Sequence, residues 1–199
     1  MFAQDYTGST DASSWTGPNL TKELKTGDAT YGNYIYLYQG GGSGARSAYT
    51  RFYDSGNNFY GDATSYVLEF DLALHSASGG NYGGNELVLY GEGASMPGGT
   101  SYFSGSNQLF RLSGGNNRST TYTVDGTSSS YTLADDEWCH YVIEVNKKNR
   151  LVTYTIMSGS TEIGSGSYTA SSDASLNIQG IEICLGRGWS AANIDNIKI

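Results

Sequence analysis

The alternation Tyr-Ile-Tyr-Leu-Tyr at residues 34–38 constrains the fold of this chain more than any other feature. Successive side chains of a β-strand point to opposite faces of a sheet, so Ile35 and Leu37 can enter an apolar core while the three tyrosines line the other face. A row of amphipathic rings on an outer face indicates a stacking surface. We therefore expect a strand that presents this row to a ligand.

The same alternation of apolar and polar residues, bounded by Gly, Asn, Asp or Ser, recurs along the chain. It predicts strands at residues 33–39, 47–54, 65–74, 85–91, 107–113, 119–124, 138–146, 151–157, 162–169, 177–186 and 193–199. No segment convincingly predicts a helix, although residues 19–25 fit a helical turn or an early strand equally well. Residues 146–150 read as a hairpin loop, which makes the strands on either side antiparallel neighbours.

The composition is typical of an all-β, turn-rich protein: 28 Gly, 17 Tyr and only two Pro, with 15% charged residues. A chain of 199 residues fits one domain, so we predict a single domain over residues 1–199. A strand-rich chain of this length should close as two packed sheets. The predicted fold class is an all-β antiparallel β-sandwich of the jelly-roll kind.

The charge excludes two classes of partner. The net charge is −8, and only eleven Lys and Arg are spread along the chain, whereas nucleic acids and anionic membranes require clustered basic residues. No segment approaches the ~20 apolar residues of a membrane span, and residues 1–5 lack the features of a signal peptide. If the parent protein is secreted or at the cell surface, we expect this chain to be an excised domain of it.

Two further segments carry candidate ligand-binding side chains. In residues 49–53, Tyr49, Arg51 and Tyr53 share one face of a strand, and if that strand joins the sheet of residues 34–38, tyrosines and a guanidinium lie on one polar surface. Such a surface suits a flat, hydroxyl-rich ligand, which points to carbohydrate. The competing platform is a Gly-flanked turn with Arg187 and Trp189. The candidate carbohydrate-binding residues are Tyr36, Tyr38, Tyr49, Arg51, Tyr53, Arg187 and Trp189.

Other residues with chemical potential give weaker signals. Trp138 opens a predicted strand and is expected to be a core residue or a hairpin anchor, whereas the role of Trp15 is open. Cys139 and Cys184 lie in separate predicted strands and fit either two buried thiols or one disulfide. The two histidines and two cysteines show no zinc-type spacing.

Several segments together resemble one family. Residues 137–145, the basic turn and residues 151–156 resemble the central hairpin of concanavalin-like and laminin-G-like sandwiches, in which a Trp opens one strand. The closing residues 193–199 are similar to the last strand of carbohydrate-binding modules attached to bacterial polysaccharide-degrading enzymes, as are residues 47–49 and 66–72. The resemblance implies a concanavalin-like sandwich and a carbohydrate ligand.

The resemblance also implies a structural calcium ion. The termini of sandwiches often run side by side, so Asp5 and Asp195 can meet. In many modules of this kind, a carboxylate from each end of the chain and backbone carbonyls hold calcium, which prefers oxygen ligands. The alternative is that Asp195 caps or hydrogen-bonds a turn.

Catalysis on such a fold requires two positioned carboxylates. In a jelly-roll xylanase or glucanase they would be sought among Glu69, Glu86, Glu144 and Glu182, but the sequence alone pairs no two of them. The segment Glu69-Phe70-Asp71 resembles a glucanase motif whose further glutamate is replaced by Ala73, and the Gln-x-His core of alginate lyases is absent. We therefore predict that the chain is not an enzyme.

The sequence predicts a non-catalytic carbohydrate-binding module. Its expected role is to anchor a linked enzyme to a complex polysaccharide, such as that of the plant cell wall, by stacking and hydrogen bonding. We expect it to be a monomer within a larger multidomain enzyme, secreted or at the cell surface. The alternatives are a catalytic jelly-roll glycoside hydrolase and an adhesion domain that binds host glycan or protein.

Overall fold

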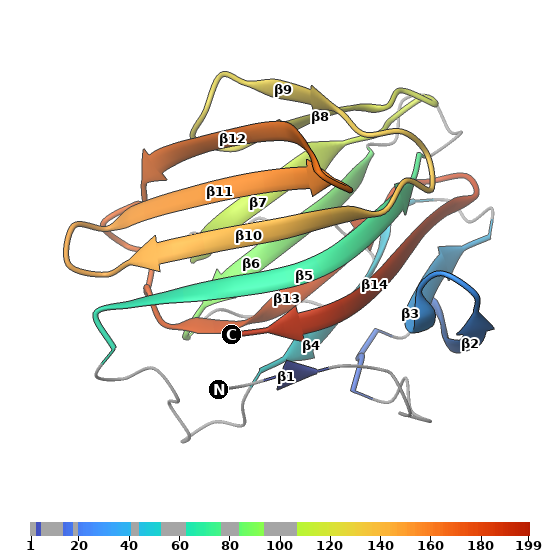
Figure 1. The fold of residues 1–199 in the computed structure, drawn as a ribbon, viewed down its shortest axis with the longest axis horizontal. Coiled ribbons are helices and arrows are strands. Elements are labelled where there is room, and N and C mark those ends of the chain that lie inside the picture. The colour runs from blue at the N-terminus through green and yellow to red at the C-terminus, as the bar shows by residue number, and fades with distance from the viewer. Residues whose placement is uncertain are drawn as a thin grey trace.

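The computed structural model shows two antiparallel β-sheets packed face to face (Figure 1). It describes residues 3–4, 14–17, 20–40, 44–52, 63–76, 84–93 and 107–199. Figure 1 looks onto the outer face of the larger sheet, with the smaller sheet behind it. The predicted antiparallel β-sandwich is confirmed.

The larger sheet has eight strands and the smaller one six. In pairing order, the larger sheet contains β12 (Thr161–Thr169), β11 (Leu151–Ser158), β10 (Cys139–Asn146), β5 (Ser65–His75), β14 (Ser190–Lys198), β3 (Gly32–Gln39) and β2 (Thr21–Asp28), with β1 (Ala3–Gln4) paired to β14. The smaller sheet contains β4 (Arg46–Arg51), β13 (Ile178–Leu185), β6 (Asn85–Gly91), β7 (Gln108–Gly114), β8 (Thr121–Val124) and β9 (Ser130–Thr132).

Each predicted strand corresponds to an observed one, with shifts at the ends. Residues 21–25 of the ambiguous segment belong to strand β2, which pairs with β3 along most of its length. The sequence did not indicate β9, because Tyr131 is the one large apolar residue among its three positions. The hairpin at residues 146–150 is confirmed, since β10 and β11 pair antiparallel from Asn146 opposite Leu151. None of the described residues forms a helix that could cross a membrane.

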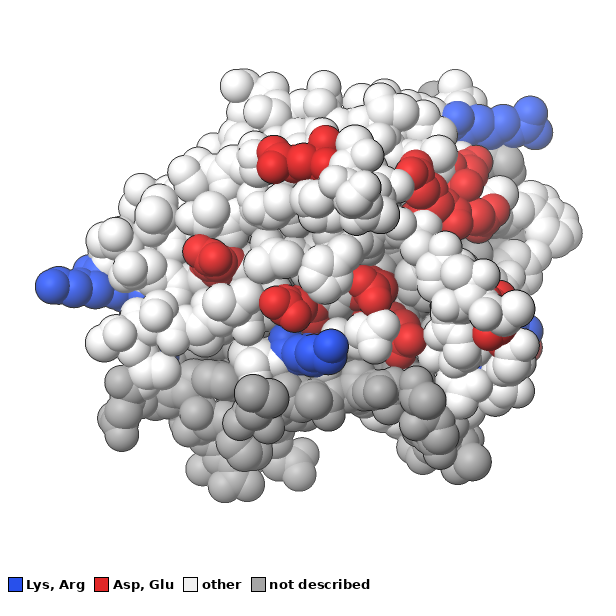
Figure 2. Space-filling model, in the orientation of Figure 1, with Lys and Arg blue, Asp and Glu red and all other residues white. Residues whose placement is uncertain are grey.

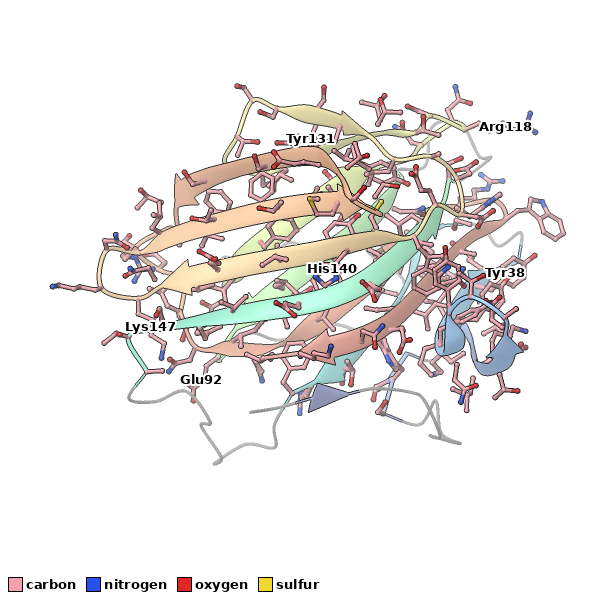
Figure 3. All side chains as sticks on the ribbon, in the orientation of Figure 1. Tyr38, Glu92, Arg118, Tyr131, His140 and Lys147 are labelled. Carbon is pink, nitrogen blue, oxygen red and sulfur yellow. The ribbon has the colours of Figure 1, made fainter. Side chains whose placement is uncertain are left out.

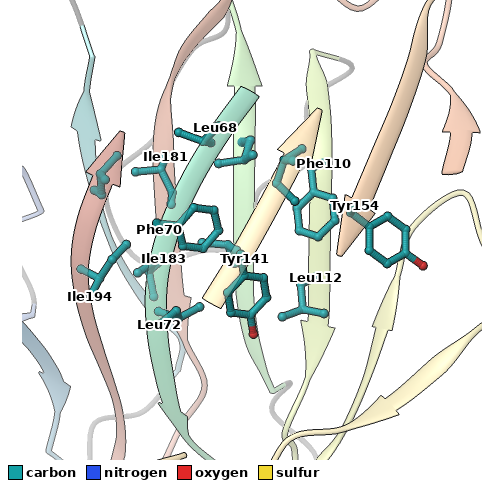
Figure 4. Packing of buried hydrophobic residues seen from close by; sticks show 14 of the residues in the cluster. Leu68, Phe70, Leu72, Phe110, Leu112, Tyr141, Tyr154, Ile181, Ile183 and Ile194 are labelled. Carbon is teal, nitrogen blue, oxygen red and sulfur yellow. The ribbon is translucent and has the colours of Figure 1, made fainter. Parts of the chain in front are cut away.

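One apolar layer fills the space between the sheets. Leu68, Phe70 and Leu72 of β5 face Ile181 and Ile183 of β13 within it (Figure 4). The ring of Phe70 stacks on Tyr141 of β10 at 5.0 Å between centroids and 6° between planes. These side chains occupy alternate positions of their strands, so the side chains between them lie on the outer face of each sheet.

The expectation that the two tyrosine rows share one sheet is wrong. Strand β3, with residues 34–38, lies in the larger sheet, whereas β4, with Tyr49 and Arg51, pairs with β13 in the smaller sheet. The alternation in each segment determines which side chains are buried, but it carries no information about the neighbouring strand. Tyr53 lies outside the described residues.

The structure decides between the two alternatives for the cysteines. Cys139 lies in the larger sheet and Cys184 in the smaller one, and both are buried free thiols. Burial raises the pKa of Cys139 to about 12 and also raises that of Cys184. Both thiols are therefore protonated and shielded at neutral pH.

We expect neither thiol to react with a thiol-specific reagent in the folded protein at pH 8, because the thiolate is the reactive form and both sulfurs are buried. Two thiols per chain should become reactive after denaturation in guanidinium. The thermal midpoint should be the same with and without a reducing agent. One reactive equivalent in the folded state, or none after denaturation, would contradict this assignment.

Candidate functional site

The tyrosine row lies on the outer face of the larger sheet, as the alternation predicts. Ile35 and Leu37 are buried in the core, while Tyr34, Tyr36 and Tyr38 are half-buried on the opposite face of β3. The neighbouring positions on this face are small or polar: Ala191 lies opposite Tyr38, and Asn193 lies opposite Tyr36. Small neighbours leave room for large rings to lie over the sheet.

The two platforms that the sequence treats as competitors form one surface. The rings of Tyr36 and Tyr38 stack at 5.8 Å between centroids and 12° between planes. The ring of Trp189, in the turn between β13 and β14, lies 6.4 Å from that of Tyr38 and tilted by 43°. Tyr38 belongs to the β2–β3 hairpin, at the right-hand end of the larger sheet in Figure 3.

The rings differ in how open they are to solvent. Tyr36 stacks on Tyr38, and the Nζ of Lys25 lies 4.9 Å from its ring centroid. Burial raises the pKa of Tyr36, so its phenol stays protonated and can donate a hydrogen bond. Trp189 is 62% exposed, the highest value among the described large hydrophobic residues. Trp189 is therefore the ring best placed to stack on a ligand.

The backbone at Trp189 is strained, with φ at +62°. Left-handed backbone costs an L-residue roughly 1–2 kcal/mol, and a bulky residue rarely adopts it. Two hydrogen bonds hold this turn in place. The Oδ1 of Asn85 accepts the Gly186 N–H at 3.1 Å, and the Ser190 hydroxyl donates to the Gly186 carbonyl. Strain of this kind persists where the surroundings enforce it, and it is frequent at ligand-binding positions.

Two rings that the sequence did not single out for binding extend this surface. Trp138 was expected in the core or as a hairpin anchor, but it is half-buried and its ring stacks on Tyr31 at 4.7 Å and 28°. Tyr34 contacts the same indole edge-on, at 5.4 Å and 77°. No local pattern indicates these contacts, because Tyr31 lies in a turn more than a hundred residues before Trp138. We call this surface the aromatic belt; it comprises Tyr31, Tyr34, Tyr36, Tyr38, Trp138 and Trp189.

The other predicted residues lie apart from the aromatic belt or contribute differently. Arg187 is half-buried in the same turn as Trp189. Tyr49 and Arg51 lie on the outer face of the smaller sheet, with the guanidinium 5.7 Å from the tyrosine centroid. They line a hollow of about 350 Å³ together with Ser14, Thr16 and Thr50.

The described residues include Asp195, one of the two predicted calcium ligands. Asp195 is buried on β14 and lies opposite Asp71 of β5. The carboxylate of Asp71 contacts His140 Nδ1 and accepts a hydrogen bond from Asn196 Nδ2, both at 2.7 Å. No group of three or more His, Cys, Asp or Glu that could hold a metal occurs within the described ranges. Strand β1 does pair with β14, so the termini run side by side as expected. Asp5 lies outside the described residues, and calcium stays a prediction.

The structure pairs two of the glutamates considered for catalysis. Glu86 and Glu182 lie on the adjacent strands β6 and β13, on the outer face of the smaller sheet. They are diagonal neighbours, since Glu86 lies directly opposite Cys184. They are 7% and 1% exposed. Arg111 contacts Glu86 at 2.5 Å, and the Tyr90 hydroxyl donates to Glu182. Carboxylates so enclosed do not present themselves to a substrate. Glu69 and Glu144 lie diagonally opposite on β5 and β10, on the outer face of the larger sheet, and are more open to solvent.

No family model matches the sequence, and no curated protein matches it. Solved structures do match the fold. A sialidase aligns with a TM-score of 0.63 and 10% identity over 98% of this chain, which spans only 18% of the sialidase chain. Lectin I-B4 from Griffonia simplicifolia aligns at 0.60 and 10% identity, over 99% of this chain and 98% of its own. The Lotus tetragonolobus seed lectin aligns at 0.61 and 13% identity, over 98% and 96%. The chain has the concanavalin-like β-sandwich that the resemblance implies.

The buried glutamates make stability depend on pH. Burial raises the pKa of Glu182 above its ordinary value of 4.5, and bonds from Ser47 and Tyr90 only partly oppose this. The folded chain thus holds the proton more tightly than the unfolded chain. The corresponding stabilisation is complete below about pH 4.5 and is lost as pH rises through the raised pKa.

We expect Glu182→Gln to reduce the loss of unfolding free energy between pH 5 and pH 8, because glutamine fills the same space and cannot ionise. Urea unfolding at the two pH values measures this difference. Glu144→Gln, at an exposed position of the larger sheet, serves as the control and should leave the pH dependence as in the parent protein. Parallel pH dependences for Glu182→Gln and the parent would contradict the assignment.

Proposed function

We propose that residues 1–199 form one non-catalytic carbohydrate-binding module, which binds a polysaccharide through the aromatic belt. The observation that carries the proposal is the exposed indole of Trp189 on a strained backbone. A large ring held open to water at a conformational cost has a role outside the packing of its own chain. Stacking on a sugar face is a role that its geometry fits.

The chemistry of the aromatic belt matches a sugar on both of its surfaces. The apolar face of a pyranose stacks on an aromatic ring, while phenol, indole and ammonium groups can bond its hydroxyls. On the scale measured for bases, one stacking ring contributes about 1–3 kcal/mol. Two proteins of similar fold are lectins, that is, carbohydrate-binding proteins, and this supports the same class of ligand here.

The charge distribution supports an uncharged ligand. Acidic side chains are spread over the face drawn in Figure 2, and basic side chains on it are few. The whole chain carries a net charge of −8. Long-range attraction therefore contributes little to binding, and contact interactions provide the affinity.

The biological role in this proposal is attachment. A module that binds a polysaccharide weakly raises the effective concentration of a linked enzyme at its substrate. We place the module, as a monomer, in a secreted or cell-surface multidomain enzyme that acts on complex polysaccharide such as that of the plant cell wall.

Trp189→Ala should weaken polysaccharide binding by roughly 5- to 150-fold, which corresponds to the loss of one stacking ring at 1–3 kcal/mol. Trp189→Gly should weaken it equally, while its thermal midpoint should exceed that of Trp189→Ala, because glycine adopts a positive φ without strain. Affinity electrophoresis in gels containing xylan, glucan, mannan or pectin measures binding, and calorimetry measures the midpoints.

Val67→Ala is the matched control, since Val67 is 40% exposed on the same face of the larger sheet but outside the aromatic belt. Its mobility in each gel should equal that of the parent protein. If the parent itself is retarded by none of these polysaccharides, the proposed function is wrong. If Trp189→Ala is retarded as strongly as the parent, the site is wrong.

A further inference from the structure

The tip of the β2–β3 hairpin leaves the larger sheet. Strand β3 pairs with β14 from Gln39 to Ile35, whereas its first residues pair with β2 alone, up to Gly32 opposite Asp28. Strands β14 and β5 lie between β3 and β10 in the sheet. Tyr31 and Tyr34 nevertheless contact Trp138, which directly precedes β10. The hairpin tip therefore lies across the outer face of β14 and β5.

Specific residues shape this tip. The carboxylate of Asp28 accepts the backbone N–H groups of Thr30 and Tyr31, both at 2.8 Å. These bonds lower the pKa of Asp28, so it is ionised at neutral pH. Gly27 and Gly32 flank the turn with φ at +76° and +69°, values that favour glycine. The local sequence thus determines where the Tyr31 ring is presented.

The aromatic belt is open at its two ends and closed in its middle. Within the pairs Tyr36–Tyr38 and Tyr31–Trp138, each ring covers one face of its partner. Exposure concentrates at Tyr31, with 43%, and at Trp189, with 62%. Among the described large hydrophobic residues, Val67 is the other exposed one. The faces available for stacking are therefore at opposite ends of a row that is several rings long.

Carboxylates surround this row. Glu23 lies opposite Tyr36 on β2. Burial is the main cause of the raised pKa of Tyr36, and the nearby carboxylates of Glu23 and Asp136 raise it further. Asp28 adds a third carboxylate at the hairpin tip. Two described basic residues lie near the row: Lys25, which is paired with Glu23, and Arg187, which is half-buried in the turn of Trp189. An acidic chain would meet repulsion along this rim, whereas uncharged hydroxyls can accept a hydrogen bond or donate one to a carboxylate.

We propose that the aromatic belt holds an internal stretch of an uncharged polysaccharide chain, which spans from Trp189 to Tyr31, and that the β2–β3 hairpin builds the second half of this site. The proposal rests on the proposed function and makes it specific. A single sugar unit covers about one ring, so both exposed ends are engaged only by a chain of several units. Hollows of about 350 Å³ are lined by other residues, and the open row suits the side of a chain rather than its end.

Isothermal titration with disaccharides and hexasaccharides of xylan, glucan and mannan tests this span, on whichever series the parent protein binds. We expect the hexasaccharide to bind at least tenfold more tightly than the disaccharide. Tyr31→Ala should remove most of this gain, so that its hexasaccharide affinity falls towards its disaccharide affinity. Tyr31→Phe keeps the ring and should behave as the parent, while Trp189→Ala should weaken both ligands. Polygalacturonate should bind more weakly than the neutral chain at low salt.

Asp28 is a positioning residue in this site. Asp28→Ala should lower hexasaccharide affinity more than disaccharide affinity. Asp28→Asn should restore it, because an amide oxygen can accept the same two N–H groups. Circular dichroism and thermal melts identify any variant that fails to fold, and the conservative pair Tyr31→Phe and Asp28→Asn keeps the comparison valid.

Two outcomes would overturn the proposed span from Trp189 to Tyr31 while leaving the proposed function in place. One is equal affinity for disaccharide and hexasaccharide; the other is an unchanged hexasaccharide affinity in Tyr31→Ala when Trp189→Ala lowers it. Tighter binding of polygalacturonate would overturn the neutral-chain assignment.

Concentration-dependent dimerisation in sedimentation, abolished by Tyr31→Ala, would instead assign the aromatic belt to an interface between copies of this chain. Loss of all polysaccharide binding by the parent would refute the proposed function itself.

Discussion

The apolar layer between the two sheets holds the outer surfaces of this protein in place. Ile35 and Leu37 are fully buried in it, and burial of apolar surface contributes roughly 25 cal/mol per Å². Because a strand alternates, the burial of these two side chains directs Tyr34, Tyr36 and Tyr38 outward. A slip by one residue would bury three tyrosines and expose two aliphatic side chains. The core thus determines the position of the aromatic belt from the opposite face of the strand.

Two local features of the protein are energetically unfavourable. Trp189 keeps a left-handed backbone and an exposed indole, and the hydrogen bonds of Asn85 and Ser190 hold its turn. On the smaller sheet, Glu86 and Glu182 are buried and have raised pKa values. The two costs differ in kind: the first presents a ring to solvent, whereas the second removes carboxylates from it. Their placement separates a surface suited to binding from one that is closed.

The sequence could predict a substantial part of the candidate site. Tyr36, Tyr38 and Trp189 belong to one surface, and each was recognisable from its strand or turn. Tyr31 and Trp138 were not recognised, because their contact joins a hairpin tip to a strand far along the chain. Tyr49 and Arg51 were placed beside the first row, but they lie on the other sheet. Asp5 and Tyr53 lie outside the described residues, so their predicted roles remain predictions.

The sequence by itself determined the class of fold, most of the strands and the inward or outward direction of their side chains. The strand repeat of two residues is a local property of the backbone, so it is visible in any segment that alternates. Only the tertiary structure decided that β3 and β4 belong to different sheets, that Trp189 lies against Tyr38, and that the hairpin tip reaches Trp138. Those relations depend on how all the strands share one core, and this shared packing is not encoded in any single segment.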